Sequence, residues 1–128
     1  MLASPRSFIA LAAVVGALLV GCAGIHEYTT GVPARDSARF YAAIQSAAEQ
    51  HGHKAWQSHD GGVQVEVAGS GSLMYSTQQG VIVVRTFPSR GGSDAQIEER
   101  ARILRGEHDQ LIAAARSDAM ANKAFAEP

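Results

Sequence analysis

Cysteine is almost absent from this chain, which has a single one, Cys22, among its 128 residues. One cysteine excludes an intramolecular disulfide. An excess of positive charge is also lacking, because the formal net charge is -1. Neutralising phosphates requires clustered lysine and arginine, so we expect no nucleic-acid partner. With 46% hydrophobic and 18% charged residues, the chain is too apolar to be disordered, and its length has room for one domain.

Known catalytic motifs are lacking as well. The sequence has no Gly-x-Ser-x-Gly turn and no zinc-protease helix motif. Its Gly69-Ser70-Gly71-Ser72 segment is not followed by the lysine and helix that a phosphate-binding loop requires. We therefore expect neither an enzyme nor a cofactor.

The N-terminus does contain the three regions of a secretory signal in their usual order: a basic residue, an apolar run and small residues. Arg6 precedes Phe8 to Val20, a 13-residue run without a charge, and small residues follow it. A helix of that length reaches about 20 Å, which is short of the roughly 30 Å hydrocarbon core of a bilayer. The pattern therefore predicts a signal peptide over residues 1–21 and disfavours a transmembrane anchor.

The end of this segment, Leu19-Val20-Gly21-Cys22, resembles the lipobox of bacterial lipoprotein precursors. The resemblance covers only the first 22 residues. It implies cleavage between Gly21 and Cys22 and attachment of acyl chains, palmitate among them, to the Cys22 thiol. Ala23 stands where an aspartate typically retains such proteins at the inner membrane. In a Gram-negative source, the resemblance therefore implies a lipid anchor in the outer membrane, with the protein facing the periplasm.

Residues 22–35 contain glycine and proline and show little periodicity, so we predict a lipidated cysteine followed by a tether. The alternative is a short strand over residues 25–30. A single domain is expected over residues 36–121, and a frayed tail over residues 122–128. The first helix should begin near Asp36, a common N-cap type, and stop at Gly52. Its apolar residues recur at helical spacing: Phe40, Ile44, Ala47 and Ala48.

Four short strands are predicted next, over about 54–59, 63–68, 73–78 and 81–87, joined by turns too short for parallel crossovers. Ser93-Asp94-Ala95-Gln96 fits a capping box, and an apolar stripe from Ile97 to Ala115 predicts a long second helix behind it. The predicted fold is a two-layer α+β domain of α-β-β-β-β-α order, with two helices packed on an antiparallel sheet of about four strands.

The last predicted strand contains Val81, Ile82, Val83 and Val84 and is apolar on both faces. At the edge of a simple meander such a strand would invite pairing with another chain. Two hypotheses follow. Either the fold buries the strand within the chain, or the strand binds a partner protein.

Histidines provide the remaining candidates for chemistry. His51, His53, His59 and Asp60 are ligand types for a divalent metal, but an extended strand would separate His53 from His59 by roughly 20 Å. We therefore predict no metal site. His108, on the apolar stripe, is expected to be a partly buried, hydrogen-bonded histidine.

Two further features offer a ligand surface. Trp56 and Tyr75 would border a small-molecule pocket if they are not part of the core. Arg90-Gly91-Gly92-Ser93 precedes a helix N-terminus, where backbone amides can hold an anion, although such segments usually serve as loops and caps.

The sequence thus predicts a lipid-anchored envelope lipoprotein that acts as a non-catalytic interaction or structural module. Its partners would be the membrane, through the acyl chains on Cys22, and an envelope protein. The alternative is a periplasm-facing lipoprotein that binds a small ligand or a metal.

Overall fold

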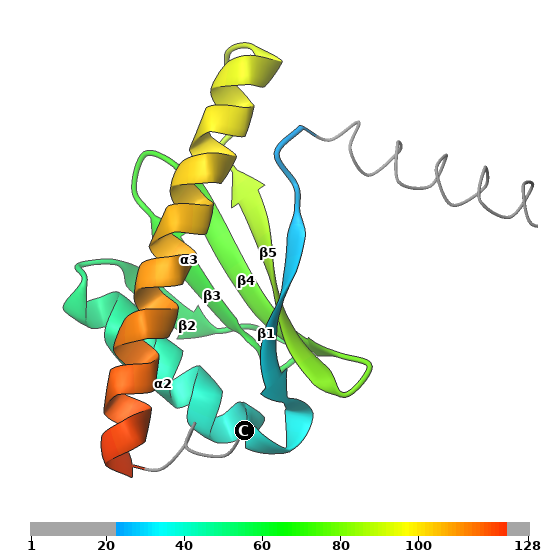
Figure 1. The fold of residues 1–128 in the computed structure, drawn as a ribbon. Helices are drawn as coiled ribbons and strands as arrows, with labels where there is room; N and C mark the ends of the chain where they lie inside the picture. The colour runs from blue at the N-terminus through cyan, green and yellow to red at the C-terminus, as the bar shows by residue number, and fades with distance from the viewer. Residues whose placement is uncertain (1–22, 123–128) are drawn as a thin grey trace, which may run out of the picture.

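The computed structural model describes residues 23–122 (Figure 1), so the predicted signal peptide, Cys22 and residues 123–128 lie outside the described residues. The element order is β1 (Glu27–Pro33), the 3-10 turn η1 (Ala34–Asp36), α2 (Ser37–Gln50), β2 (Lys54–Gln57), β3 (Val63–Val67), β4 (Gly71–Gln78), β5 (Val81–Pro88) and α3 (Asp94–Asn122).

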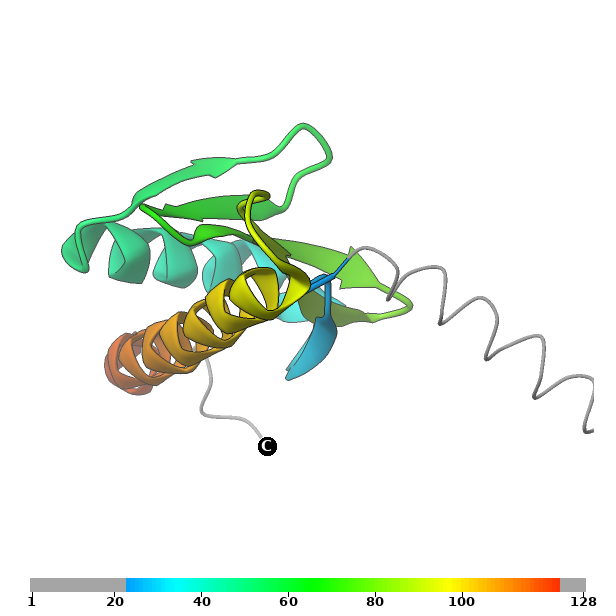
Figure 2. The ribbon, with the colours of Figure 1, turned by 90° about the horizontal axis from the view of Figure 1, so that it is seen from above.

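The five strands form one antiparallel sheet in the order β1-β5-β4-β3-β2. Both helices lie on one side of this sheet (Figure 2). The predicted α+β class with two helices on an antiparallel sheet is therefore confirmed, and the sheet has one strand more than expected.

The additional strand, β1, corrects the predicted tether. Residues 27–33 pair with β5, with Glu27 opposite Arg85 and Thr29 opposite Val83. Val32, at 7% exposed, is the only buried residue of β1, and the other inward-facing residues are only half-buried, so the sequence shows no clear alternation of apolar and polar residues. β1 is joined to the sheet by its antiparallel pairing with β5, and Tyr28 and Val32 pack against the core. The domain thus begins well before residue 36. The prediction of a tether through residue 35 was wrong, and the alternative of a short strand in this segment is the one that the structure supports, with bounds Glu27–Pro33.

β1 also settles the position of the strand that is apolar on both faces. β5 is hydrogen-bonded to β1 on one side and to β4 on the other, so it has no free edge. Ile82 and Val84 are fully buried toward the helices, and Val83 is only 5% exposed on the opposite face. Val81 to Val84 therefore do not form a partner-binding edge. The hypothesis of burial within the chain is the correct one.

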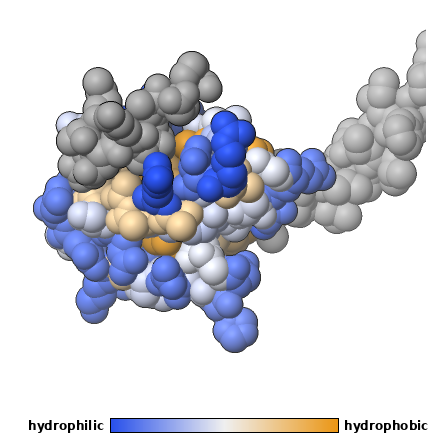
Figure 3. Space-filling model, turned by 90° about the horizontal axis from the view of Figure 1, so that it is seen from below, coloured by the Kyte–Doolittle hydropathy of each residue, from blue (hydrophilic) through white to orange (hydrophobic). Residues whose placement is uncertain are grey.

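The core lies between the sheet and the two helices. Val63 and Val65 of β3 are fully buried there, together with Phe40 and Ile44 of α2 and Leu104 of α3. This burial follows from the period-2 alternation of the strand and the 3.6-residue spacing of the helices. At the lower end of the domain, Figure 3 shows an apolar area bordered by hydrophilic residues.

Local hydrogen bonds define the end of α2 and the start of α3. Ser93 and Gln96 form the predicted capping box, with Ser93 N donating to Gln96 Oε1 at 2.8 Å and Gln96 N to Ser93 Oγ at 3.2 Å. α2 ends in a Schellman motif in which Gly52 has a φ of +84° and His53 N donates to Ala48 O at 2.9 Å. The predicted stop at Gly52 is confirmed. Asp36 takes the N-cap position as predicted, although its side chain makes no capping hydrogen bond.

Within residues 23–122, no helix combines the length and the apolar character needed to cross a membrane.

Candidate functional site

The face of the sheet opposite the helices is not covered by any described element. Cross-strand pairing places one residue from each strand in a single row on this face, in the order Glu27, Arg85, Met74, Gln64 and Trp56. Arg85 Nε donates to Glu27 Oε1 at 2.7 Å at one end of the row. At the other end, the Trp56 side chain is 41% exposed.

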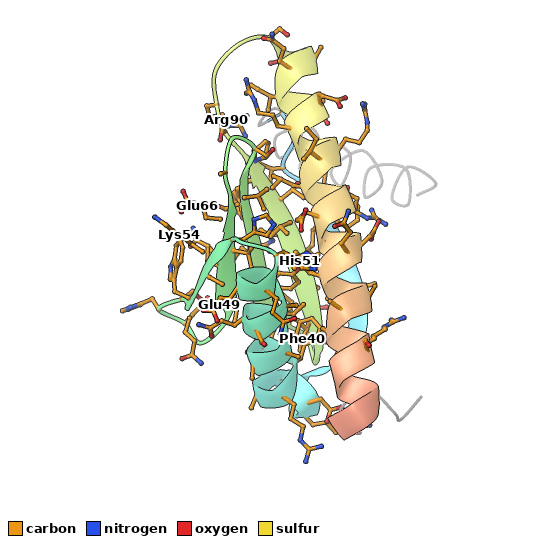
Figure 4. The ribbon with its side chains drawn as sticks, turned by 90° about the vertical axis from the view of Figure 1, so that its left-hand side faces the viewer. Phe40, Glu49, His51, Lys54, Glu66 and Arg90 are labelled. Carbon is orange, nitrogen blue, oxygen red and sulfur yellow. The ribbon has the colours of Figure 1, made fainter. Side chains whose placement is uncertain are left out.

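A second row on the same face contains Phe87, Ser72, Glu66 and Lys54. Figure 4 shows Lys54 and Glu66 on the side of the molecule away from the helices. Phe87 is half-buried, so the uncovered face combines one exposed ring, Trp56, and one half-buried ring with charged groups. Trp56, Phe87, Met74 and Arg85 belong to residue types that are enriched at protein interfaces, whereas Lys54 and Glu66 belong to depleted types.

A different feature lies at the start of the described chain, directly after the predicted lipid site. Gly24 N donates to Glu98 Oε2 at 2.8 Å, and Gly24 O accepts a 2.6 Å hydrogen bond from Thr86 Oγ1. His26 adds a 3.0 Å contact from its Nε2 to Glu98 Oε1 and a 3.1 Å hydrogen bond from its N to Thr86 Oγ1. Residues 24–26 are therefore held against β5 and α3. The hydrogen bonds from His26 and Gly24 lower the pKa of Glu98.

Gly24 is required by this arrangement. Its φ is +79°, and an added Cβ would lie 2.5 Å from Pro88 Cγ. Only glycine adopts this backbone conformation without strain and leaves room for the proline.

His108 was predicted to be a buried, hydrogen-bonded histidine, and the structure confirms this. It is 6% exposed, and its Nδ1 lies 2.8 Å from the hydroxyl of Tyr75, which is fully buried. Burial lowers the pKa of His108 to about 4, so the ring is neutral at physiological pH. Burial raises the pKa of Tyr75 above its ordinary value, so the phenol keeps its proton and the hydrogen bond joins two neutral groups. Tyr75 is thus a core residue and cannot border a ligand pocket.

Two of the four residues weighed as metal ligands do come together, with a third group that sequence spacing does not indicate. His51 Nδ1 lies 3.2 Å from Glu107 Oε2, and His53 Nε2 lies 2.9 Å from the same oxygen. The three ligand atoms all lie within 4.8 Å of one another. His51 sits at the C-terminal end of α2 (Figure 4), and Glu107 reaches it from the middle of α3.

The electrostatics of this cluster keep the carboxylate charged. Partial burial alone would raise the pKa of Glu107, but the two imidazoles beside it outweigh burial and lower the pKa below its ordinary value. His59 and Asp60 do not belong to the cluster. They lie in the turn between β2 and β3, where Asp60 Oδ1 accepts a 2.5 Å hydrogen bond from Ser58 Oγ.

Glu107 was not predicted as a site residue, because periodicity identifies the apolar residues of a helix that are buried and Glu107 is not one of them. It flanks the buried stripe of α3, next to His108 and three residues after Leu104. A carboxylate at that position is normally solvated. Only the packing of α2 against α3 brings it to His51 and His53.

The Arg90-Gly91-Gly92-Ser93 segment serves as a loop and helix cap. Arg100 donates through Nη1 to Ser89 O and Gly91 O, both at 2.8 Å. The Ser93 N–H is occupied by the Gln96 side chain. Two carbonyls and one backbone amide at this helix start are therefore hydrogen-bonded within the domain.

The chain matches no family model, no curated protein and no solved structure in the comparisons made with each.

Proposed function

We propose that this chain is a bacterial envelope lipoprotein, lipidated at Cys22, whose domain acts as a non-catalytic interaction module for another envelope protein. The anchor rests on the lipobox and on the signal-like segment before it. Ala23 favours the outer membrane, facing the periplasm, if the source is Gram-negative.

The observation that carries the interaction role is the uncovered sheet face with its exposed Trp56. An amphipathic antiparallel sheet ordinarily turns a polar face to water. Here the row that spans all five strands ends in a tryptophan that is 41% exposed, with Met74 in its middle. Tryptophan is among the residues most often responsible for binding energy at protein interfaces.

The position of residues 24–26 adds a second support. Since Gly24 and His26 are hydrogen-bonded to the domain, a lipid on Cys22 would hold the domain within a few residues of the bilayer. A partner would then meet the sheet face in a restricted orientation. Restricting orientation in advance lowers the entropic cost of association.

The anchor is tested by labelling cells with a fatty acid and by fractionation. Wild-type protein should take up the label and fractionate with membranes, and Cys22→Ala should do neither. A Cys22→Ala protein that remains wholly with membranes, beside an unlabelled wild type, would refute lipidation.

The interaction role is tested by crosslinking in membranes followed by purification of the full chain. Trp56→Ala should lose a partner that wild type captures. Ile103→Ala is the matched control, because Ile103 is the other large hydrophobic residue exposed among residues 23–117, at 47%, and lies on α3. If Trp56→Ala is folded and retains every partner of wild type, the sheet face has no such role.

A further inference from the structure

The group formed by His51, His53 and Glu107 has the composition of a metal centre. We propose that these three side chains bind one divalent transition-metal ion, and that Zn²⁺ is the ion that best matches them. The proposal departs from the expectation of no metal site, which compared His53 with His59 and did not include a residue of α3.

The distances within the cluster match those between ligands of a single ion. Bonds of about 2.0–2.1 Å at tetrahedral angles place neighbouring ligand atoms about 3.3 Å apart. The two imidazole nitrogens lie 3.2 and 2.9 Å from Glu107 Oε2. The remaining separation, between the two nitrogens, is within 4.8 Å. Small side-chain rotations would therefore complete the site, without movement of the backbone.

The Nε2 atom of His53 gives an independent indication. It is buried and makes no hydrogen bond, although it lies only 2.9 Å from a carboxylate oxygen. A buried polar atom without a partner is costly and calls for an explanation. The ring nitrogen is not aligned for donation to Glu107, whereas the comparable His26 Nε2 does hydrogen-bond to Glu98 at 3.0 Å. A cation bound to both residues would occupy the lone pair of His53.

The local fold presents both imidazoles to α3. The Schellman motif at the end of α2 turns the chain at Gly52, so that His51 and His53 flank a fixed left-handed residue. His53 is then followed directly by β2. A bound ion would link this connection to the middle of α3 and would stabilise the packing of the two helices.

The donor set decides the class of ion. Two imidazole nitrogens and one carboxylate oxygen suit zinc and its neighbours, whereas magnesium and calcium prefer oxygen ligands alone. Three protein ligands leave the fourth tetrahedral position for water or another ligand. The side chains of His51, His53 and Glu107 are 31%, 15% and 17% exposed, so an ion can reach them from solvent.

The test is a Zn²⁺ titration by calorimetry on the metal-stripped full chain, purified in detergent without a histidine tag. Wild type should bind one Zn²⁺ per chain, and excess Mg²⁺ should not displace it. Glu107→Gln should weaken binding at least about tenfold. Glu98→Gln is the matched control, because Glu98 also contacts a histidine but only one, and it should bind Zn²⁺ like wild type.

His51→Ala is the second variant, because His51 is the most exposed of the three and the least able to affect folding. It should also lose at least about tenfold in affinity. Zn²⁺ should raise the melting temperature of wild type and of Glu98→Gln, and not that of Glu107→Gln. Absence of saturable binding to folded wild type, or wild-type affinity in either ligand variant, would overturn the proposal. The site lies in the helical layer, so neither result bears on the proposed function of the sheet face.

Discussion

The buried pair of Tyr75 and His108 allows a quantitative test of how the core is held together. Tyr75→Phe removes the hydroxyl that is hydrogen-bonded to His108 Nδ1 at 2.8 Å and keeps the aromatic ring. His108 is 6% exposed, so its nitrogen would be left in the interior without that partner. Leaving a buried polar group unsatisfied costs about 1–3 kcal/mol. For a domain of this size, each kcal/mol lowers the melting temperature by about 4–8 °C.

The pairwise character of this interaction is measured by a double-mutant cycle. His108→Leu alone should destabilise the domain because it leaves the Tyr75 hydroxyl unsatisfied. In Tyr75→Phe with His108→Leu, neither polar group remains. The double variant should therefore be more stable than the sum of the single effects predicts, by about 1 kcal/mol or more.

The assay is urea unfolding of all four proteins at neutral pH, where His108 is neutral. The m-values should agree, so that changes in midpoint report stability. If Tyr75→Phe lies within about 0.5 kcal/mol of wild type, or if the single effects simply add, the hydrogen bond is not a determinant of stability.

Three further predictions follow from the fold. Val84→Lys should prevent folding because it buries a charge in the core. Val83→Lys, on the uncovered face, should leave a folded domain that is about 1–2 kcal/mol less stable, because lysine can extend to solvent. Circular dichroism and urea unfolding distinguish the two outcomes. Gly24→Ala should lower the melting temperature of the domain more than Gly80→Ala. Both glycines have positive φ, but an added Cβ would clash with another residue only at Gly24. Equal melting temperatures of the two variants would refute this. The lowered pKa of Glu98 contributes stability that is present above its unfolded-state pKa and lost as pH falls through its folded-state pKa. Wild type should therefore lose more stability than Glu98→Gln between about pH 5 and pH 3 in acid unfolding curves.

Much of this fold was predictable because the local sequence patterns agree with the packing of the folded domain. The spacing of Phe40 and Ile44 predicts α2, the alternation of Val63, Val65 and Val67 predicts β3, and Ser93 with Gln96 predicts the start of α3. The first two patterns reflect a face that the fold buries, and the third reflects hydrogen bonding at an exposed helix start.

The strand β1 was predicted only as the alternative to a tether, and the cluster around Glu107 was not predicted; the reasons differ. β1 contains glycine and proline and has one buried residue, Val32, so its apolar pattern is weak, and it pairs with a strand about 55 residues away in sequence. Glu107 is 56 residues from His51 and meets it through helix packing. Periodicity reports which face of an element is buried, but not which elements meet.

The hydrogen bonds at Gly24 and His26 have a consequence for how a lipidated form of this chain would work. A flexible linker between the lipid and a domain would allow the domain to take many orientations and distances relative to the membrane. With residues 24–26 fastened to β5 and α3, the anchor would set the tilt of the sheet relative to the bilayer. Such a domain would meet partners that move laterally in or beside the same membrane. It would be poorly suited to reaching across the periplasm.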